Sequence, residues 1–181
     1  MPISCFDATI KPINQAIESL RNIMRFGQKY AQQQGIDEAS LLEKRLFADM
    51  FELRGQIYLL QLLAVNQGAL RVLEITPSTK AAPCGTFAEI DELLSGLIDD
   101  LGSIDPEAFE RRMTEPVHCD LPIGPTTFPV AKDYMLQWVL PHTYFHVTTA
   151  YNILRNNGVP LTKGNFLGPV AMKVQSDPQP K

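Results

Sequence analysis

The strongest constraint on this chain is a helical period of apolar residues that recurs in several long segments. In residues 8–33 the apolar side chains fall three and four positions apart, at Ile13, Ile17, Leu20 and Met24. This spacing places them on one face of an amphipathic helix, which tolerates Pro12 only within its first turn. Further long helices are predicted at 49–73, 87–101 and 131–156. Four such helices with short connections predict an all-α four-helix bundle.

Local signals mark where these helices begin and end. Asp49 with Glu52, and Thr86 with Glu89, have the spacing of a capping box, which satisfies unpaired backbone N–H groups at a helix start. Gly158 predicts a left-handed stop after the last helix. A proline at position 141, inside that helix, predicts a kink there or a break just before it.

The connections are predicted to be short, and the chain to form one domain. Residues 37–46 indicate a short connecting helix and residues 76–85 a loop. The alternating segment 117–130 predicts a short hairpin or an extended connection before the last long helix. We expect a single domain over 1–168 and a flexible tail over 169–181, which is polar and rich in proline.

Charge and composition argue against several classes of function. The net charge is -4 and no cluster of Lys or Arg stands out, which argues against a nucleic-acid partner. The longest apolar stretch, 57–65, is too short to span a membrane, and no export signal opens the chain, so we expect a cytoplasmic protein. Cys5, Cys84 and Cys119 lack the spacing of a disulfide framework or a thiolate zinc site, and we expect reduced thiols.

The clearest chemical signal is a pair of histidines, His142 and His146, four residues apart. This separation places both imidazoles on one helix face, where they could converge on a single cation. A metal site also needs a third ligand, and two partly buried histidines bonded to carbonyls or to a neighbouring helix explain the spacing equally well. His118 is next to Cys119 and Asp120, but consecutive residues of an extended chain point to alternate faces and cannot all meet one ion.

Three further residues are candidates for the lining of a pocket near these histidines. Gln56 and Gln61 lie in the apolar middle of the second predicted helix, where a side-chain amide needs a partner. They could line a pocket opposite His142, together with Trp138, or pair with neighbouring polar groups. No phosphate loop, dinucleotide fingerprint or nucleophile elbow is present, so no catalytic residue is identified.

The last part of the chain resembles a known family. Residues 140–158, LPHTYFHVTTAYNILRNNG, and their continuation VPLTKGNFLG resemble the C-terminal signature of an uncharacterised bacterial family of DinB/YfiT-like four-helix bundles. ADMFELRGQI at 48–57 and GIDEASLL at 35–42 are also similar to that family. Together the matches run from about residue 5 to 168.

The resemblance implies an up-down-down-up bundle, often a homodimer, whose cavity in the wider superfamily holds a divalent ion on three histidines. His142 and His146 match the two C-terminal histidines and are followed similarly by Arg155 and Gly158. The remaining histidine, from the second helix, has no counterpart, because no histidine precedes His118. Members with known activity resemble thiol-dependent transferases and isomerases.

Two hypotheses follow from the sequence. In the first, the cavity of a DinB-like homodimer binds a small ligand and a divalent metal, nickel or zinc, on His142 and His146. In the second, the protein is a non-catalytic ligand-binding or interaction protein that has lost the metal site. The sequence leaves open whether the protein is an enzyme.

Overall fold

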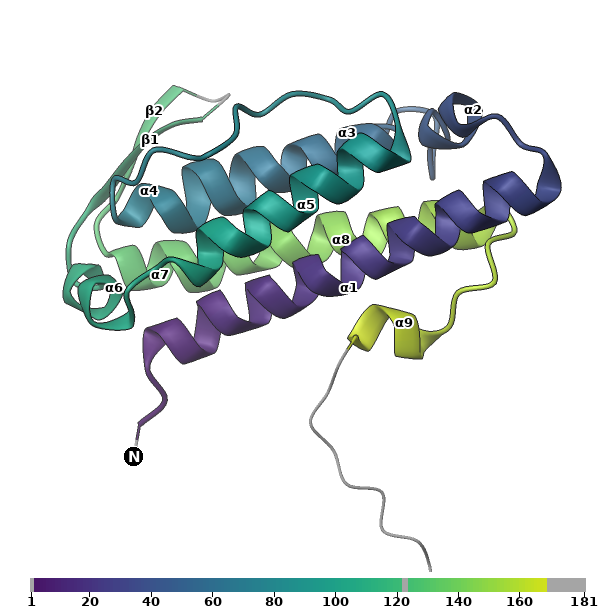
Figure 1. Cartoon of the computed structure of the whole chain (residues 1–181). Helices are drawn as coiled ribbons and strands as arrows, with labels where there is room; N and C mark the ends of the chain where they lie inside the picture. Colours follow the sequence, from purple (N-terminus) through teal and green to yellow (C-terminus); the bar gives the residue numbers. More distant parts are fainter. Residues whose placement is uncertain (1, 122–123, 169–181) are drawn as a thin grey trace, which may run out of the picture.

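Four long helical segments lie side by side along a common axis in the structure, a computed structural model that describes residues 2–121 and 124–168 (Figure 1). The first is α1 (Cys5–Gln34), and the third is α5 (Phe87–Gly102). The second consists of α3 (Leu53–Leu59), the π-helical η1 (Leu60–Ala69) and α4 (Leu70–Val72). The fourth consists of α7 (Ala131–Tyr134), the π-helical η2 (Met135–Val139) and α8 (Leu140–Asn156). The first and fourth segments run opposite to the other two, which confirms the predicted up-down-down-up bundle.

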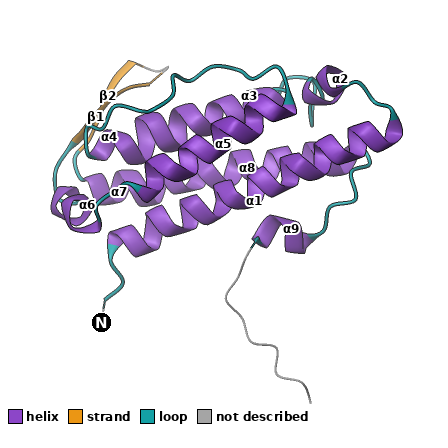
Figure 2. Ribbon diagram, in the orientation of Figure 1, coloured by secondary structure: helices purple, strands orange, loops and turns teal. Residues whose placement is uncertain are grey.

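Shorter elements close the two ends of the bundle (Figure 2). The connecting helix α2 (Glu38–Leu42) lies at one end, as predicted. At the other end, β1 (Val117–Leu121) and β2 (Gly124–Phe128) form an antiparallel hairpin with Val117 opposite Phe128, which confirms the predicted hairpin. The helices α6 (Pro106–Arg112) and α9 (Lys163–Leu167) were not predicted. The predicted flexible tail, 169–181, lies outside the described residues.

The first helix begins earlier than its apolar period indicated. Ser4 caps it by accepting a hydrogen bond from the backbone N–H of Asp7 at 3.0 Å. Pro12 therefore lies inside the helix, beyond its first turn, and its expected place in the first turn was wrong. The helix ends at Gly35, whose φ of 64° is left-handed, a conformation that glycine adopts at little cost.

The predicted capping box at the start of the second helix was wrong. The helix begins at Leu53, and the side chain of Glu52, its N-cap residue, makes no capping hydrogen bond. The Glu52 carboxylate instead pairs with Arg45 at 2.7 Å and with Arg54 at 3.4 Å. The two guanidinium groups thus bind the carboxylate that the capping box would have placed on a backbone N–H.

The capping box predicted for the third helix is present in part. Thr86 accepts a hydrogen bond from the Glu89 N–H at 3.2 Å, as a cap residue does. The Glu89 carboxylate, however, accepts from the N–H of Gly85 at 2.6 Å rather than from that of Thr86. The start of α5 at Phe87 is therefore as the sequence predicted.

The predicted break before Pro141 is absent, because the π-helical segment η2 leads directly into α8, which contains Pro141 in its first turn. A proline has no N–H to donate and its ring crowds the preceding turn. The wider turns of a π-helix, bonded from i to i+5, accommodate such an interruption within a continuous helical path.

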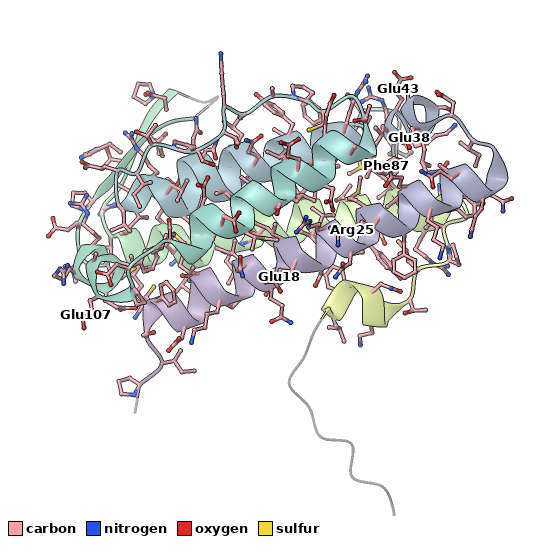
Figure 3. The ribbon with its side chains drawn as sticks, viewed as in Figure 1. Glu18, Arg25, Glu38, Glu43, Phe87 and Glu107 are labelled. Atoms are coloured by element: carbon pink, nitrogen blue, oxygen red, sulfur yellow. The ribbon has the colours of Figure 1, made fainter. Side chains whose placement is uncertain are left out.

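The bundle closes around an apolar core, and α1 contacts both α5 and α8. Ion pairs reinforce the first of these contacts, because Arg21 and Arg25 of α1 reach Asp91 of α5 at 2.9 and 2.6 Å. Their hydrogen bonds lower the pKa of Asp91 to about 2. Figure 3 shows Arg25 on α1. No helix in the described part of the chain is long and apolar enough to cross a bilayer.

Candidate functional site

The two predicted histidines meet at one groove between the second helix and α8. His142 and His146 lie one turn apart on α8, with ring centroids 6.2 Å apart. Both line an open groove of about 630 Å³. The other residues that line it are all apolar: Phe51, Leu59, Leu63, Pro141 and Phe145. The imidazoles are therefore the polar groups of an apolar groove.

The protonation of His146 is set by Gln56 on α3. The His146 ring is buried, with 5% of its surface exposed, and its Nδ1 lies 2.8 Å from Gln56 Oε1. The Gln56 amide nitrogen donates to the carbonyl of Phe51 at 2.9 Å, so the amide oxygen is the atom that faces the imidazole. Because that oxygen only accepts, Nδ1 carries the proton and Nε2 keeps a free lone pair.

His142 has the same arrangement with a backbone partner. Its Nδ1 lies 2.8 Å from the carbonyl oxygen of Trp138, which also only accepts. The Trp138 ring packs against the His142 ring at a centroid distance of 4.4 Å. Neither Nε2 atom hydrogen-bonds to a described residue. A carbonyl on Nδ1 is the common way in which proteins orient imidazoles that bind through Nε2.

Burial keeps His146 uncharged at neutral pH. Burial and, to a smaller extent, the neighbouring His142 together lower the pKa of His146 to about 4. The groove therefore offers a lone pair rather than a positive charge at this position.

The donor set does not complete a metal site within one chain. Among the described residues no group of three or more His, Cys, Asp and Glu could hold a metal ion. Two imidazoles on one tetrahedral ion have ring centres about 5 Å apart, whereas these rings are 6.2 Å apart. One chain thus supplies two ligands, and the rings would have to close by about 1 Å to share an ion.

The other predicted pocket residues, Gln56, Gln61 and Trp138, do not line the groove. Gln56 reaches His146 but binds its Nδ1, so it orients the ring. Gln61 does not line the groove, and its amide nitrogen lies 3.1 Å from Thr79 Oγ1. Trp138 packs behind His142 and is not among the lining residues.

The trio 118–120 alternates along β1 as predicted. His118 is exposed and its Nδ1 lies 2.9 Å from Thr127 Oγ1, whereas Cys119 is buried and Asp120 is exposed. Cys5, Cys84 and Cys119 are free thiols, and burial raises the pKa of each. Low thiolate content makes them poor nucleophiles.

Sequence reasoning missed the apolar walls of the groove. Phe51 and Phe145 are 56% and 55% exposed, which is unusual for phenylalanine. The spacing of apolar residues could not predict that these two side chains are exposed. Phe51 precedes its helix, and Phe145 lies beside the buried face of α8.

Comparison with known proteins agrees with this fold. A family model described as a domain of unknown function (DUF1993) matches residues 5–167. The chain is similar to the crystal structure of a DinB family member protein from Shewanella denitrificans, with a TM-score of 0.76 and 25% sequence identity over 94% of this chain and 95% of that one. A search of curated proteins gives no match.

Proposed function

The chain belongs to the domain of unknown function family DUF1993 and has a DinB-like fold, and from this premise we propose that it binds a small molecule in the groove between the second helix and α8. The observation that carries the proposal is the pair of oriented imidazoles, His142 and His146, with their Nε2 lone pairs free in an apolar groove. Ligand sites commonly combine apolar walls with a few fixed polar groups.

The two imidazoles define what the ligand must offer. A neutral imidazole with a bare Nε2 accepts hydrogen bonds or binds a cation. The ligand therefore has an apolar body and an N–H or O–H donor, or it arrives together with a divalent ion. Nickel and zinc suit imidazole donors, and the remaining positions would have to be filled by the ligand or by water.

Catalysis is a further part of the proposal. Relatives that the sequence resembles use a bound metal in thiol-dependent transferase or isomerase reactions. The incomplete donor set in one chain is why ligand binding, rather than a reaction, is the function we put first.

A second candidate function is favoured by the exposed aromatic residues. Phe51 and Phe145 stand at the groove with more than half of their surface exposed. In a non-catalytic interaction protein they would pack against a second copy of the chain, and this homodimer would cover the groove.

Metal binding is tested on protein purified without a histidine tag. Zinc or nickel is added, excess metal is removed by dialysis, and bound metal is measured by elemental analysis. We expect retained metal in the parent and none in a His142→Ala/His146→Ala variant. His118→Ala is the matched control, because it removes the remaining histidine of the chain, which lies outside the groove. Loss of metal in this control would show adventitious binding at His118.

Ligand binding is tested with phenol and toluene, which differ in the hydroxyl donor. The ¹⁵N shifts of the two Nε2 atoms report a donated hydrogen bond, and the fluorescence of Trp138, the single tryptophan, reports a change beside His142. Phenol has one hydroxyl donor, so it should shift at least one of the two nitrogens, and toluene should leave both nearly unchanged. A parent protein that takes up no metal and responds to neither compound would refute the proposed function. A stable dimer under those conditions, with Phe145→Ser a monomer, would favour the second candidate.

A further inference from the structure

Two arginines and a histidine converge where the second helix ends. Arg71 lies on α4, Arg112 on the last turn of α6 and His118 on β1. All three line one pocket of about 170 Å³, and its other lining residues are Glu74, Pro116 and Val117. None of these residues lines the groove between the second helix and α8. The two arginines outnumber the single carboxylate, so the pocket is a separate, basic site in a chain whose net charge is -4.

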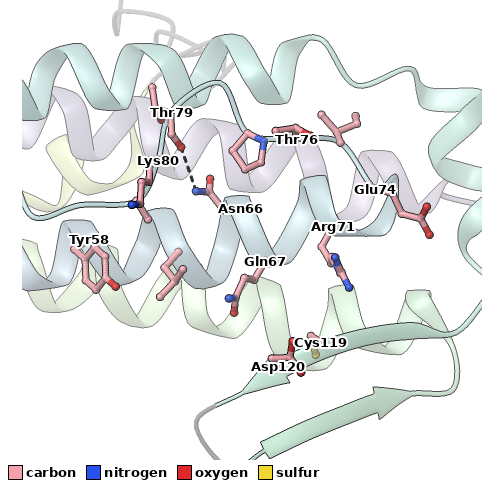
Figure 4. A pocket seen from close by; sticks show the side chains of 14 residues that line it. Tyr58, Asn66, Gln67, Arg71, Glu74, Thr76, Thr79, Lys80, Cys119 and Asp120 are labelled. Atoms are coloured by element: carbon pink, nitrogen blue, oxygen red, sulfur yellow. Dashed lines mark hydrogen bonds between the residues drawn. The ribbon is translucent and has the colours of Figure 1, made fainter.

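Both guanidinium groups are held in place through Nε. Arg71 Nε donates to the carbonyl oxygen of His118 at 2.9 Å, and Arg112 Nε donates to that of Val72 at 3.1 Å. A guanidinium held in this way keeps its terminal N–H donors for other partners. Figure 4 shows the Arg71 guanidinium turned towards β1. Because the two side chains are already oriented, a ligand that binds them loses less conformational entropy on their account.

The single carboxylate in the pocket holds the arginines only weakly. Glu74 Oε1 lies 3.4 Å from Arg112 Nη2, which is long for a charge-assisted hydrogen bond, and 75% of the Glu74 side chain is exposed. Arg71 forms no ion pair with a described residue. Figure 4 shows the charged groups of Arg71 and Glu74 apart. Exposed ion pairs contribute little to stability, so an anion can replace Glu74 at Arg112.

The backbone at Glu74 is strained. Its φ of 56° is the only left-handed value of a non-glycine residue within 2–121 and 124–168. The second helix ends here in a turn that joins the Ile75 N–H to the Leu70 carbonyl at 3.0 Å, and the left-handed position of such a turn is usually glycine. Strained residues cluster at ligand sites. Here the strained residue supplies the carboxylate beside Arg112, which glycine would lack.

His118 supplies a third donor to the pocket. Its side chain is exposed, and its Nδ1 lies 2.9 Å from Thr127 Oγ1. The threonine hydroxyl can donate to Nδ1, and the ring proton then lies on Nε2, which bonds to no described residue. Donors that come from three elements suit a tetrahedral oxyanion, whereas one arginine fork already satisfies a planar carboxylate. The pocket is also smaller than the roughly 300–1,000 Å³ of sites for drug-sized ligands, so it suits a single group.

We propose that this pocket binds a phosphate group through Arg71, Arg112 and His118, and that Glu74 pairs with Arg112 until the phosphate replaces it. The phosphate is either inorganic phosphate or the end of a phosphate monoester. The organic part of a monoester has room in a neighbouring pocket of about 660 Å³, because the two pockets share Arg71 and Glu74. This site is independent of the groove that contains the two other histidines, so either proposal can fail without the other.

The test uses inorganic phosphate, phenyl phosphate and benzoate at constant ionic strength. Affinities are measured by titration calorimetry, and the Nε–H signals of Arg71 and Arg112 are followed by NMR in the ¹⁵N-labelled full chain. Both phosphates should shift the two signals. Benzoate, which carries the same ring on a carboxylate, should bind at least about 10-fold more weakly than phenyl phosphate. Tighter binding of phenyl phosphate than of inorganic phosphate identifies a monoester as the ligand, and equal or weaker binding identifies free phosphate.

Variants distinguish this pocket from a general effect of charge. Arg71→Gln and Arg112→Gln should each weaken phosphate binding at least about 10-fold, since each removes a charge-assisted contact. Arg111→Gln is the matched control, because Arg111 is exposed on α6 and does not line the pocket. Glu74→Gln should tighten binding by about 2- to 5-fold, since it removes the competing carboxylate. Glu107→Gln makes the same change of charge outside the pocket and should leave the affinity unchanged.

Three results would overturn the proposal. The first is that neither arginine signal responds to inorganic phosphate or to phenyl phosphate. The second is that Arg111→Gln weakens binding as much as Arg71→Gln, because binding would then follow net charge alone. The third is that Glu74→Gln weakens binding. The His142→Ala/His146→Ala variant should bind phosphate as the parent does, which keeps this test separate from that of the groove.

Discussion

Acidification should destabilise this protein through His146, and the size of the effect follows from its burial. Burial, followed by the neighbouring His142, lowers the pKa of His146 from 6.5 to about 4 in the folded chain. Between pH 6.5 and 4, His146 is protonated in the unfolded chain but stays neutral in the folded chain. The free energy of unfolding therefore falls as the pH drops towards 4 and then levels off. Each pKa unit is worth about 1.36 kcal/mol, which gives a loss of about 3 kcal/mol.

The variant that isolates this effect is His146→Asn. The asparagine NH₂ takes the place of Nδ1–H and can still donate to Gln56 Oε1, which is 2.8 Å from Nδ1 in the parent. It has no proton to gain. Carboxylates that titrate in the same range are common to both proteins, so the difference between parent and variant reports His146.

The assay is urea unfolding of both proteins at a series of pH values from 7 to 4. For a chain of this length, about 3 kcal/mol corresponds to a fall in Tm of about 6–12 °C, which calorimetry can check. The free-energy difference between parent and variant should change steadily between pH 6.5 and 4. A difference that stays flat over this range would refute the reasoning that burial holds His146 neutral.

Three further changes have defined outcomes. Gln56→Leu leaves the Nδ1–H of His146 without an acceptor, so it should cost about 1–3 kcal/mol in urea unfolding and change the tautomer seen by ¹⁵N NMR. Asp91→Asn removes the carboxylate whose pKa is lowered to about 2; it should cost about 1 kcal/mol at neutral pH, and the difference from the parent should vanish as the pH falls through 3.8 towards 2. Gly158→Ala, at a φ of 93°, would place a Cβ 2.5 Å from the Tyr30 hydroxyl, and it should lower Tm by several degrees, about 1–3 kcal/mol. An unchanged Tm in this variant would mean that the turn relaxes freely.

The fold was predictable where the signal was local and repeated. The period of apolar residues predicted the four long segments, and alternation in residues 117–130 predicted the hairpin. The cap at Thr86 was predicted correctly, but the one at Asp49 was not. At Glu52 the outcome depends on Arg45 and Arg54, and a capping pattern does not include competing charges.

The candidate site was predictable in its pair of histidines but not in its surroundings. Spacing alone placed His142 and His146 on one face. It also placed Gln56 and Gln61 in the same helix, and only the structure shows that one binds His146 and the other Thr79. The difference arises because residues five positions apart on a helix wound at 3.6 residues per turn point about 140° apart, so the two amides face different neighbours, and the sequence does not identify those neighbours.

The position of η1 in the bundle links its two faces. It contributes Leu63 to the groove and Asn66 to a separate pocket between the second helix, the loop that follows it and β1. Were its wide turns to tighten into ordinary α-helical winding, both walls would rotate together, because they belong to the same ten residues. A substitution that restores ordinary winding in η1 would therefore alter both faces of the second helix at once.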